Sequence, residues 1–231
     1  GRPAEALAVL SHVPQTARLV DEQRYGRLVH LKIVSMLDLA SAPETKPAAA
    51  LELLEEAQQI AQTAEDAITA RLALGEFHER SQARDGLLKA CLEYAALAYD
   101  PTGDQMMNES ADAFERKAVL LADRQLADLL PRLSAAQTEN LTEALQQRLA
   151  EAIATRNTGQ LRRISSCAAL TRLAVQADMA LGVWAARDLA YEQAEACLRR
   201  VIERAESPEL IAEALARLAI IHLQPGELHL P

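Results

Sequence analysis

The chain has 231 residues, of which 50% are hydrophobic but only 3% aromatic. Strands rely on β-branched and aromatic residues, so this composition disfavours a β-sheet, whereas the abundant Ala, Leu, Glu, Gln and Arg are strong helix formers. The formal net charge of −9 argues against nucleic-acid binding, which needs a clustered basic face. No apolar run approaches the roughly 18 residues of a membrane span, and no signal-peptide pattern opens the chain. We therefore expect a soluble, all-helical protein of the cytoplasm or periplasm.

The N-terminal part reads as a series of helices, because each segment between turn signals carries apolar residues at the spacing of a helix with one buried face. A short helix is expected in residues 1–10, and the helix that follows Asp21 carries Leu28, Leu31, Ile33, Val34, Leu37 and Leu39. Two prolines in residues 41–47 interrupt the pattern. Further helices are then expected over residues 50–61, 65–81 and 88–97, with turns at residues 84–86 and 100–104.

The middle of the chain predicts longer helices. An amphipathic helix is expected over residues 104–130, ended by Pro131, and Ser134 is expected to cap a helix that runs to Ile153. Asn157, Thr158 and Gly159 break this helix before a short one over residues 161–165. The C-terminal part then predicts helices over residues 168–186, from Tyr191 onward, and over residues 209–223, where Pro208 opens the last one.

A repeat is visible in residues 175–208, where Leu181-Gly182 is followed by Trp184, Tyr191, Ala194, Leu198, Val201 and Pro208. This pattern resembles the tetratricopeptide repeat, in which small residues let the two helices of a hairpin approach closely. Weaker resemblances cover residues 68–101, with Leu74-Gly75, His78, Ala90, Tyr94 and Leu97, and residues 212–226, with Leu215, Leu218, Ala219 and His222. The resemblance implies an α-α superhelix, a right-handed helical-hairpin solenoid of about 10–11 helices.

The resemblance covers only part of the chain. We expect one helical-repeat domain over residues 1–231, with N-terminal repeats in residues 1–101 and C-terminal repeats in residues 168–231. Residues 104–166 carry no such signature and form either an insert of long helices or atypical repeats. The segment Thr158–Ser165 resembles helical regions that flank β-propellers in large bacterial proteins, and 20 Arg against 4 Lys suits a GC-rich genome. The chain is therefore expected to be a fragment of a larger bacterial protein.

Residues that could carry catalysis or bind a cofactor are not grouped into known motifs. His12, His30, His78, His222 and His229 form no H-E-x-x-H pattern, and the eight glycines form no phosphate-binding loop. His78 and His222 stand where the family places an aromatic residue, so we expect both to pack. Cys91, Cys167 and Cys197 lie in apolar helical stretches and are expected in the core. The sequence therefore predicts no enzyme, no metal and no cofactor.

The repeat resemblance implies a concave groove lined by the helices over residues 65–81, 168–186 and 209–223. The candidate groove contacts are Arg71, Glu76, Arg80, Gln176, Arg187 and Arg217. The predicted function is a non-catalytic scaffold or adaptor that binds a peptide or partner helix through charge-assisted hydrogen bonds and an apolar anchor. One alternative is an architectural spacer beside other domains such as a β-propeller. The groove of such a spacer would be filled by its own side chains or covered by the 104–131 helix. The other alternative is a ligand-sensing repeat domain.

Overall fold

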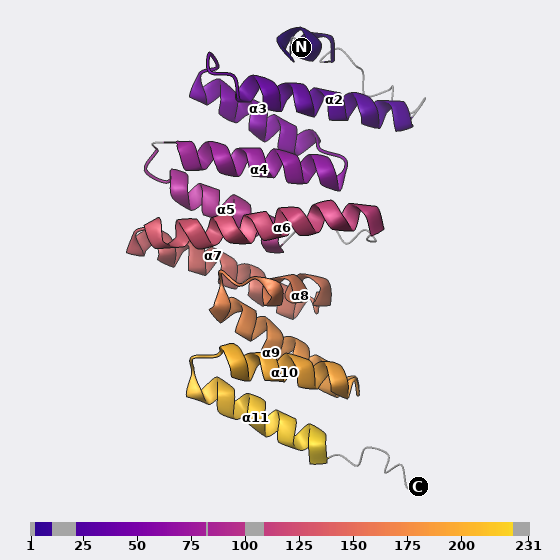
Figure 1. The fold of residues 1–231 in the computed structure, drawn as a ribbon, viewed down its shortest axis with the longest axis vertical. Coiled ribbons are helices and arrows are strands. Elements are labelled where there is room, and N and C mark those ends of the chain that lie inside the picture. Colours follow the sequence, from indigo (N-terminus) through magenta and orange to yellow (C-terminus); the bar gives the residue numbers. More distant parts are fainter. Residues whose placement is uncertain (1–2, 11–21, 82, 100–108, 224–231) are drawn as a thin grey trace. The chain divides into compact units, whose positions relative to one another are not determined.

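The computed structural model describes residues 3–10, 22–81, 83–99 and 109–223. Within these ranges the chain forms eleven α-helices and one short 3-10 helix, without any strand, so the prediction of an all-α fold is confirmed (Figure 1). None of these helices combines the length and the apolar character that crossing a membrane requires. The turn expected at residues 100–104, together with His12 and His229, lies outside the described residues.

The chain divides into two compact units, residues 1–138 and 139–231. The division falls inside α7 (Ala135–Ala154), within the region 104–166 that lacks a repeat signature. Ser134 caps α7 as predicted: its hydroxyl accepts a hydrogen bond from the Gln137 N–H at 3.4 Å, and the Gln137 side chain accepts one from the Ser134 N–H at 3.0 Å. This reciprocal capping box satisfies N–H groups that the first helical turn leaves unpaired.

Unit 1 is a series of helices in which each packs on the next. Its members are α1 (Pro3–Leu10), α2 (Glu22–Ala40), α3 (Pro47–Ile60), α4 (Ala64–Arg80), α5 (Gly86–Tyr99) and α6 (Glu109–Leu129), followed by the 3-10 helix η2 (Leu130–Arg132). Contacts also join α2 to α4 and α4 to α6, so alternate helices lie close enough to touch. This pattern of first- and second-neighbour contacts is typical of stacked helical hairpins.

The buried face of α2 differs from the sequence expectation. Val29, Ile33 and Met36 form the buried stripe and pack with Ala57 and Ala70, whereas Leu31 and Val34 are 52% and 39% exposed. The segment is apolar on more than one side, and the residues at i, i+4 and i+7 from Val29 happen to face the neighbouring helices. The expectation that Leu31 and Val34 belong to the buried face was therefore wrong.

Close helix approach in unit 1 depends on Gly75. A Cβ atom at this position would lie 2.7 Å from Cε1 of Tyr94, the largest of the fully buried side chains, on α5. A real Cβ cannot come that near a packed ring, so only glycine lets α4 and α5 cross at this distance. The Tyr94 hydroxyl lies 3.5 Å from Oε2 of Glu79, and burial raises the pKa of this phenol.

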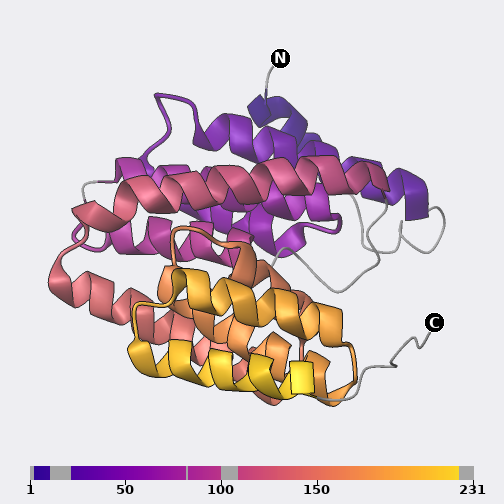
Figure 2. The ribbon, with the colours of Figure 1, turned by 60° about the horizontal axis from the view of Figure 1, so that its bottom comes forward.

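Unit 2 contains the remaining helices α8 (Thr158–Ser166), α9 (Thr171–Arg187), α10 (Tyr191–Arg204) and α11 (Pro208–Leu223). Consecutive helices pack on each other, and α9 also contacts α11; Figure 2 shows α10 beside α11. Val175, Leu198, Val201, Ala214 and Leu218 form one buried cluster that joins α9, α10 and α11. Pro208 opens α11 as predicted.

The ring of His222 does not pack into the core as expected, because its side chain is 60% exposed and its Nε2 lies 3.9 Å from Glu195. No helix follows α11 in the described part of unit 2 to cover that side. His78, in contrast, is buried as predicted. The three cysteines are also buried and carry free thiols.

Candidate functional site

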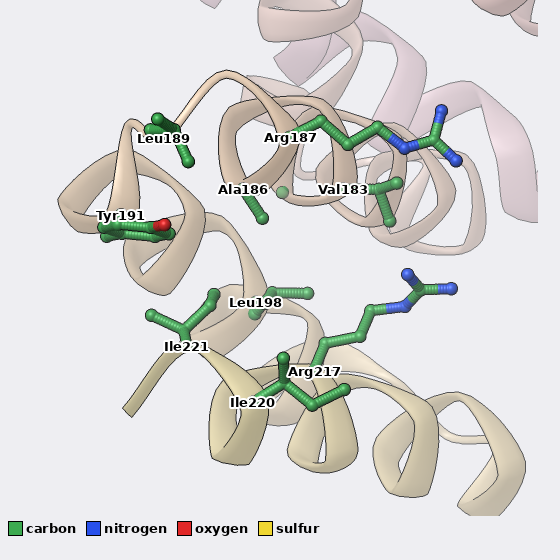
Figure 3. Close-up of a pocket in the computed structure, with 10 residues that line it drawn as sticks. Val183, Ala186, Arg187, Leu189, Tyr191, Leu198, Arg217, Ile220 and Ile221 are labelled. Carbon is green, nitrogen blue, oxygen red and sulfur yellow. The ribbon is translucent and has the colours of Figure 1, made fainter. Parts of the chain in front are cut away.

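A cavity of about 380 Å³ lies between α9, α10 and α11 in unit 2 (Figure 3). Most of the lining is apolar, and the guanidinium groups of Arg187 and Arg217 are its charged part. The lining residues are Gly182, Val183, Ala186, Arg187, Leu189, Tyr191, Leu198, Arg217, Ile220 and Ile221. Its size falls in the lower part of the range for small-ligand pockets, roughly 300–1,000 Å³, which suits one or two side chains of a peptide.

Gly182 and Leu198 hold the cavity's inner wall in place. A Cβ atom at Gly182 would lie 3.0 Å from Cγ of Leu198 and 3.3 Å from Cβ of Cys197, so the prediction that this glycine permits close helix approach is confirmed. Leu198 is fully buried and belongs to the cluster that joins the three helices. The cavity walls are therefore attached to a packed core, which keeps its shape fixed.

Arg187 and Arg217 extend to the same side of the cavity, one from α9 and the other from α11, with Val183 between them (Figure 3). Arg217 is partly buried and donates hydrogen bonds to Glu213 one turn earlier. Arg187 is exposed and forms no ion pair with any residue of the described ranges. One guanidinium group at the cavity's edge is thus held in place and the other is open to a ligand carboxylate.

Leu189 stands at the cavity's rim in an unusual backbone conformation. Its φ angle is +61°, and the N–H of Ala190 donates to the carbonyl of Ala185 at 2.8 Å, as in a Schellman motif that ends α9. Glycine is the common residue at this position, because a left-handed conformation costs an ordinary residue roughly 1–2 kcal/mol. Leu189 is nevertheless a large apolar residue, and it is 68% exposed.

A buried carboxylate fixes the helices behind the cavity. Oδ1 of Asp178, which is fully buried, accepts hydrogen bonds from the Ser165 hydroxyl at 2.7 Å and from Nε and Nη2 of Arg200 at 2.9 and 2.7 Å. Arg204 lies 3.7 Å from Oδ2 of Asp178 and donates to the Ser165 carbonyl at 2.8 Å. The network ties α8, α9 and α10 together. Sequence reasoning missed it, because its members lie up to 39 residues apart.

The other predicted groove residues are not at this cavity. In unit 1, Arg71 lies 3.5 Å from Glu93 on α5, and Glu76 and Arg80 pair with each other at 2.7 Å. Gln176 is exposed on α9 but does not line the cavity. The structure therefore brings together Arg187 and Arg217 from the predicted set, and it leaves the remaining four elsewhere.

Two of the buried thiols lie in surroundings that disfavour the reactive thiolate. Burial raises the pKa of the Cys91 thiol to about 11, and the charge of Glu79 adds to this shift. Burial also raises the pKa of Cys197, against the opposing effect of Arg200, whose Nη2 lies 3.3 Å from its sulfur. Among the described residues, no three His, Cys, Asp or Glu side chains gather closely enough to hold a metal ion.

Comparison of the chain with protein-family models, curated proteins and solved structures finds no match. The functional assignment therefore depends on the geometry of the cavity and its rim.

Proposed function

We propose that the chain is a non-catalytic interaction module of the tetratricopeptide-like kind, and that it binds an extended peptide at the cavity between α9, α10 and α11. An aliphatic side chain of the peptide enters the cavity, and a neighbouring carboxylate of the same peptide is held by Arg187 and Arg217. The apolar lining and the two guanidinium groups on one side support this division of roles. All the residues that line the cavity belong to unit 2, which favours unit 2 as the binding unit.

Leu189 is the observation that carries the proposal. A leucine in a left-handed conformation costs stability, and its exposure means that it recovers little of this cost by packing within the chain. Leu189 lines the apolar cavity, where a bound peptide would cover it. Strain kept at the rim of a pocket is a feature of binding sites.

The test is a selection from a displayed library of random 12-residue peptides. Wild-type protein is expected to enrich peptides in which a large aliphatic residue lies within a few positions of Asp, Glu or the terminal carboxylate. The double variant Arg187→Glu, Arg217→Glu is expected to select Lys and Arg in place of the acidic residues, because the charge at the cavity's edge is reversed. Arg172→Glu is the matched control, since Arg172 is an exposed residue of α9 that does not line the cavity.

Leu189→Gly separates binding from folding. Glycine relieves the left-handed strain, so the free energy of unfolding should stay equal or rise by about 1 kcal/mol. Affinity for the selected peptide should nevertheless fall severalfold, because an apolar contact is lost. The proposal fails if the charge-reversed protein enriches the same peptides as wild type, or if Leu189→Gly lowers stability and leaves affinity unchanged.

A further inference from the structure

Two arginines of α10 are anchored by neighbouring helices. Nη1 of Arg204 donates a hydrogen bond to the carbonyl of Ser165 on α8 at 2.8 Å. Arg200 donates through Nε and Nη2 to Oδ1 of the fully buried Asp178 on α9. Both arginines are still partly exposed, Arg200 to 36% and Arg204 to 39%. Within the described part of unit 2, the other terminal nitrogen of each guanidinium group has no hydrogen-bond partner. Each group therefore keeps an unused donor in a fixed position.

Arg162 adds a third guanidinium group from α8. It lies one helical turn before Ser165, whose carbonyl accepts the hydrogen bond from Arg204. Burial raises the pKa of the Cys197 thiol, and the charges of Arg200 and Arg162 both oppose this rise. Because Nη2 of Arg200 lies 3.3 Å from the Cys197 sulfur, the charge of Arg162 acts on the region that Arg200 occupies. Arg162 itself is exposed and forms no hydrogen bond or ion pair within the described ranges.

The charges of this arginine group do not balance. Asp178 is the carboxylate that Arg200 and Arg204 approach, so three guanidinium groups and one carboxylate leave two positive charges. Glu203 is exposed near Arg200 on α10, but it forms no ion pair with any described residue. A phosphate monoester carries about −1.5 to −2 charges at pH 7, and its oxygens match the donor geometry of guanidinium groups. A single carboxylate would neutralise only half of the excess.

We propose that Arg162, Arg200 and Arg204 form a binding site for a phosphate monoester, the doubly charged group of a phosphorylated side chain or of free phosphate. The unused donors of Arg200 and Arg204 bind its oxygens, and Arg162 neutralises the remaining charge. Asp178 is a positioning residue, because it fixes the Arg200 guanidinium from within the core. Little side-chain entropy is lost on binding, since two of the three groups are already held. The site shares no residue with the lining of the peptide cavity, so it stands independently of the proposed function.

The first probe is inorganic phosphate at about pH 7.5, titrated into the uniformly ¹⁵N-labelled 231-residue chain. The ionic strength is held at about 0.15 M with sodium chloride, so that distant charges are screened. Amide shifts should saturate on residues 162–166 and 197–204. Dimethyl phosphate, which carries a single negative charge, should bind at least about tenfold more weakly, because it neutralises only one of the two excess charges.

Matched variants locate the site. Arg162→Gln removes a guanidinium group without a partner in the fold, so stability should be retained while inorganic phosphate binds about tenfold more weakly. Arg199→Gln is the control, because Arg199 is also an exposed arginine of α10 but pairs with Glu195. It should change phosphate affinity by less than about twofold. The double variant Arg187→Gln, Arg217→Gln removes the arginines of the peptide cavity and should bind phosphate as wild type does.

A second probe identifies the source of the phosphate group. A Gly-Ser peptide with one phosphoserine that binds more tightly than inorganic phosphate would identify a phosphorylated side chain, and equal or weaker affinity would identify free phosphate.

Four outcomes would overturn the proposal. They are the absence of saturable shifts with inorganic phosphate, equal affinity for dimethyl phosphate, unchanged phosphate affinity in Arg162→Gln, and loss of phosphate binding in the Arg187→Gln, Arg217→Gln variant. Circular dichroism of each variant verifies that the helices are retained.

Discussion

Replacement of Gly75 by alanine tests whether close helix crossing determines the geometry of unit 1. The new Cβ would lie 2.7 Å from Cε1 and 2.9 Å from Cζ of Tyr94. The ring is almost fully buried, so it has no free space to move into. Overpacking of this kind typically costs about 1–3 kcal/mol, while alanine gains up to about 1 kcal/mol over glycine in helix propensity. The net expectation is a loss of up to about 2 kcal/mol in the free energy of unfolding.

Gly26→Ala is the matched control in the same unit. A Cβ atom at Gly26, inside α2, would meet nothing within 4 Å, so this variant should gain stability by up to about 1 kcal/mol. The difference between the two variants cancels the propensity gain and isolates an overpacking cost of about 1–3 kcal/mol. Urea unfolding followed by circular dichroism at 222 nm measures both.

A further variant tests whether the Tyr94 ring causes the loss of stability in Gly75→Ala. Tyr94→Leu removes the ring atoms that a Cβ at residue 75 would meet, so Gly75→Ala should be much less costly in that background. The close crossing of α4 and α5 would be refuted if Gly75→Ala stabilised the chain as much as Gly26→Ala does.

Asp178→Ala should lower the free energy of unfolding by about 2 kcal/mol, because hydrogen bonds from Ser165 and Arg200 to a buried carboxylate are lost. Glu213→Ala removes an exposed ion pair and should change the free energy of unfolding by less than about 0.5 kcal/mol. Equal effects of the two variants would contradict a stabilising role of the Asp178 network. Cys91, whose pKa is raised to about 11, should not react with a disulfide reagent at pH 8 until the chain is unfolded, and rapid reaction of the native protein would refute its burial. Burial, reinforced by the charge of Lys89, lowers the pKa of His78 in the folded chain below its usual 6.5. As the pH falls, the imidazole is therefore protonated in the unfolded chain before it is protonated in the folded one. The free energy of unfolding should accordingly decrease as the pH drops below about 6.5. His78→Leu should flatten that part of the pH profile of unfolding, and an unchanged slope would count against this cause.

The sequence predicted the helices well, because their start and stop signals are local. Ser134 and Pro208 mark the first turns of α7 and α11 as expected. The small residues of the repeat signature were also informative, since Gly75 and Gly182 lie where a Cβ would meet the following helix. Local signals of this kind do not reveal which face of a largely apolar helix is buried, and Leu31 and Val34 were assigned to the wrong side of α2 for that reason.

The candidate site was only partly predictable. Arg187 and Arg217 were among the groove contacts that the repeat resemblance implied, and both line the cavity. Leu189 was missed, because its importance comes from a left-handed backbone conformation, which a leucine in a sequence does not predict. The Asp178 network was missed because Ser165 and Arg200 come from other helices. Contacts between distant segments require the packing to be known.

Nuclear magnetic resonance titration tests the binding cavity most directly. The tightest peptide from the library selection is added to the uniformly ¹⁵N-labelled chain, and amide shifts are followed residue by residue. The largest shifts are expected on residues 182–191 and 217–221, and they should disappear in the Arg187→Glu, Arg217→Glu variant. Shifts centred instead on Arg71 and Arg80 in α4, or an unchanged response in the double variant, would contradict it.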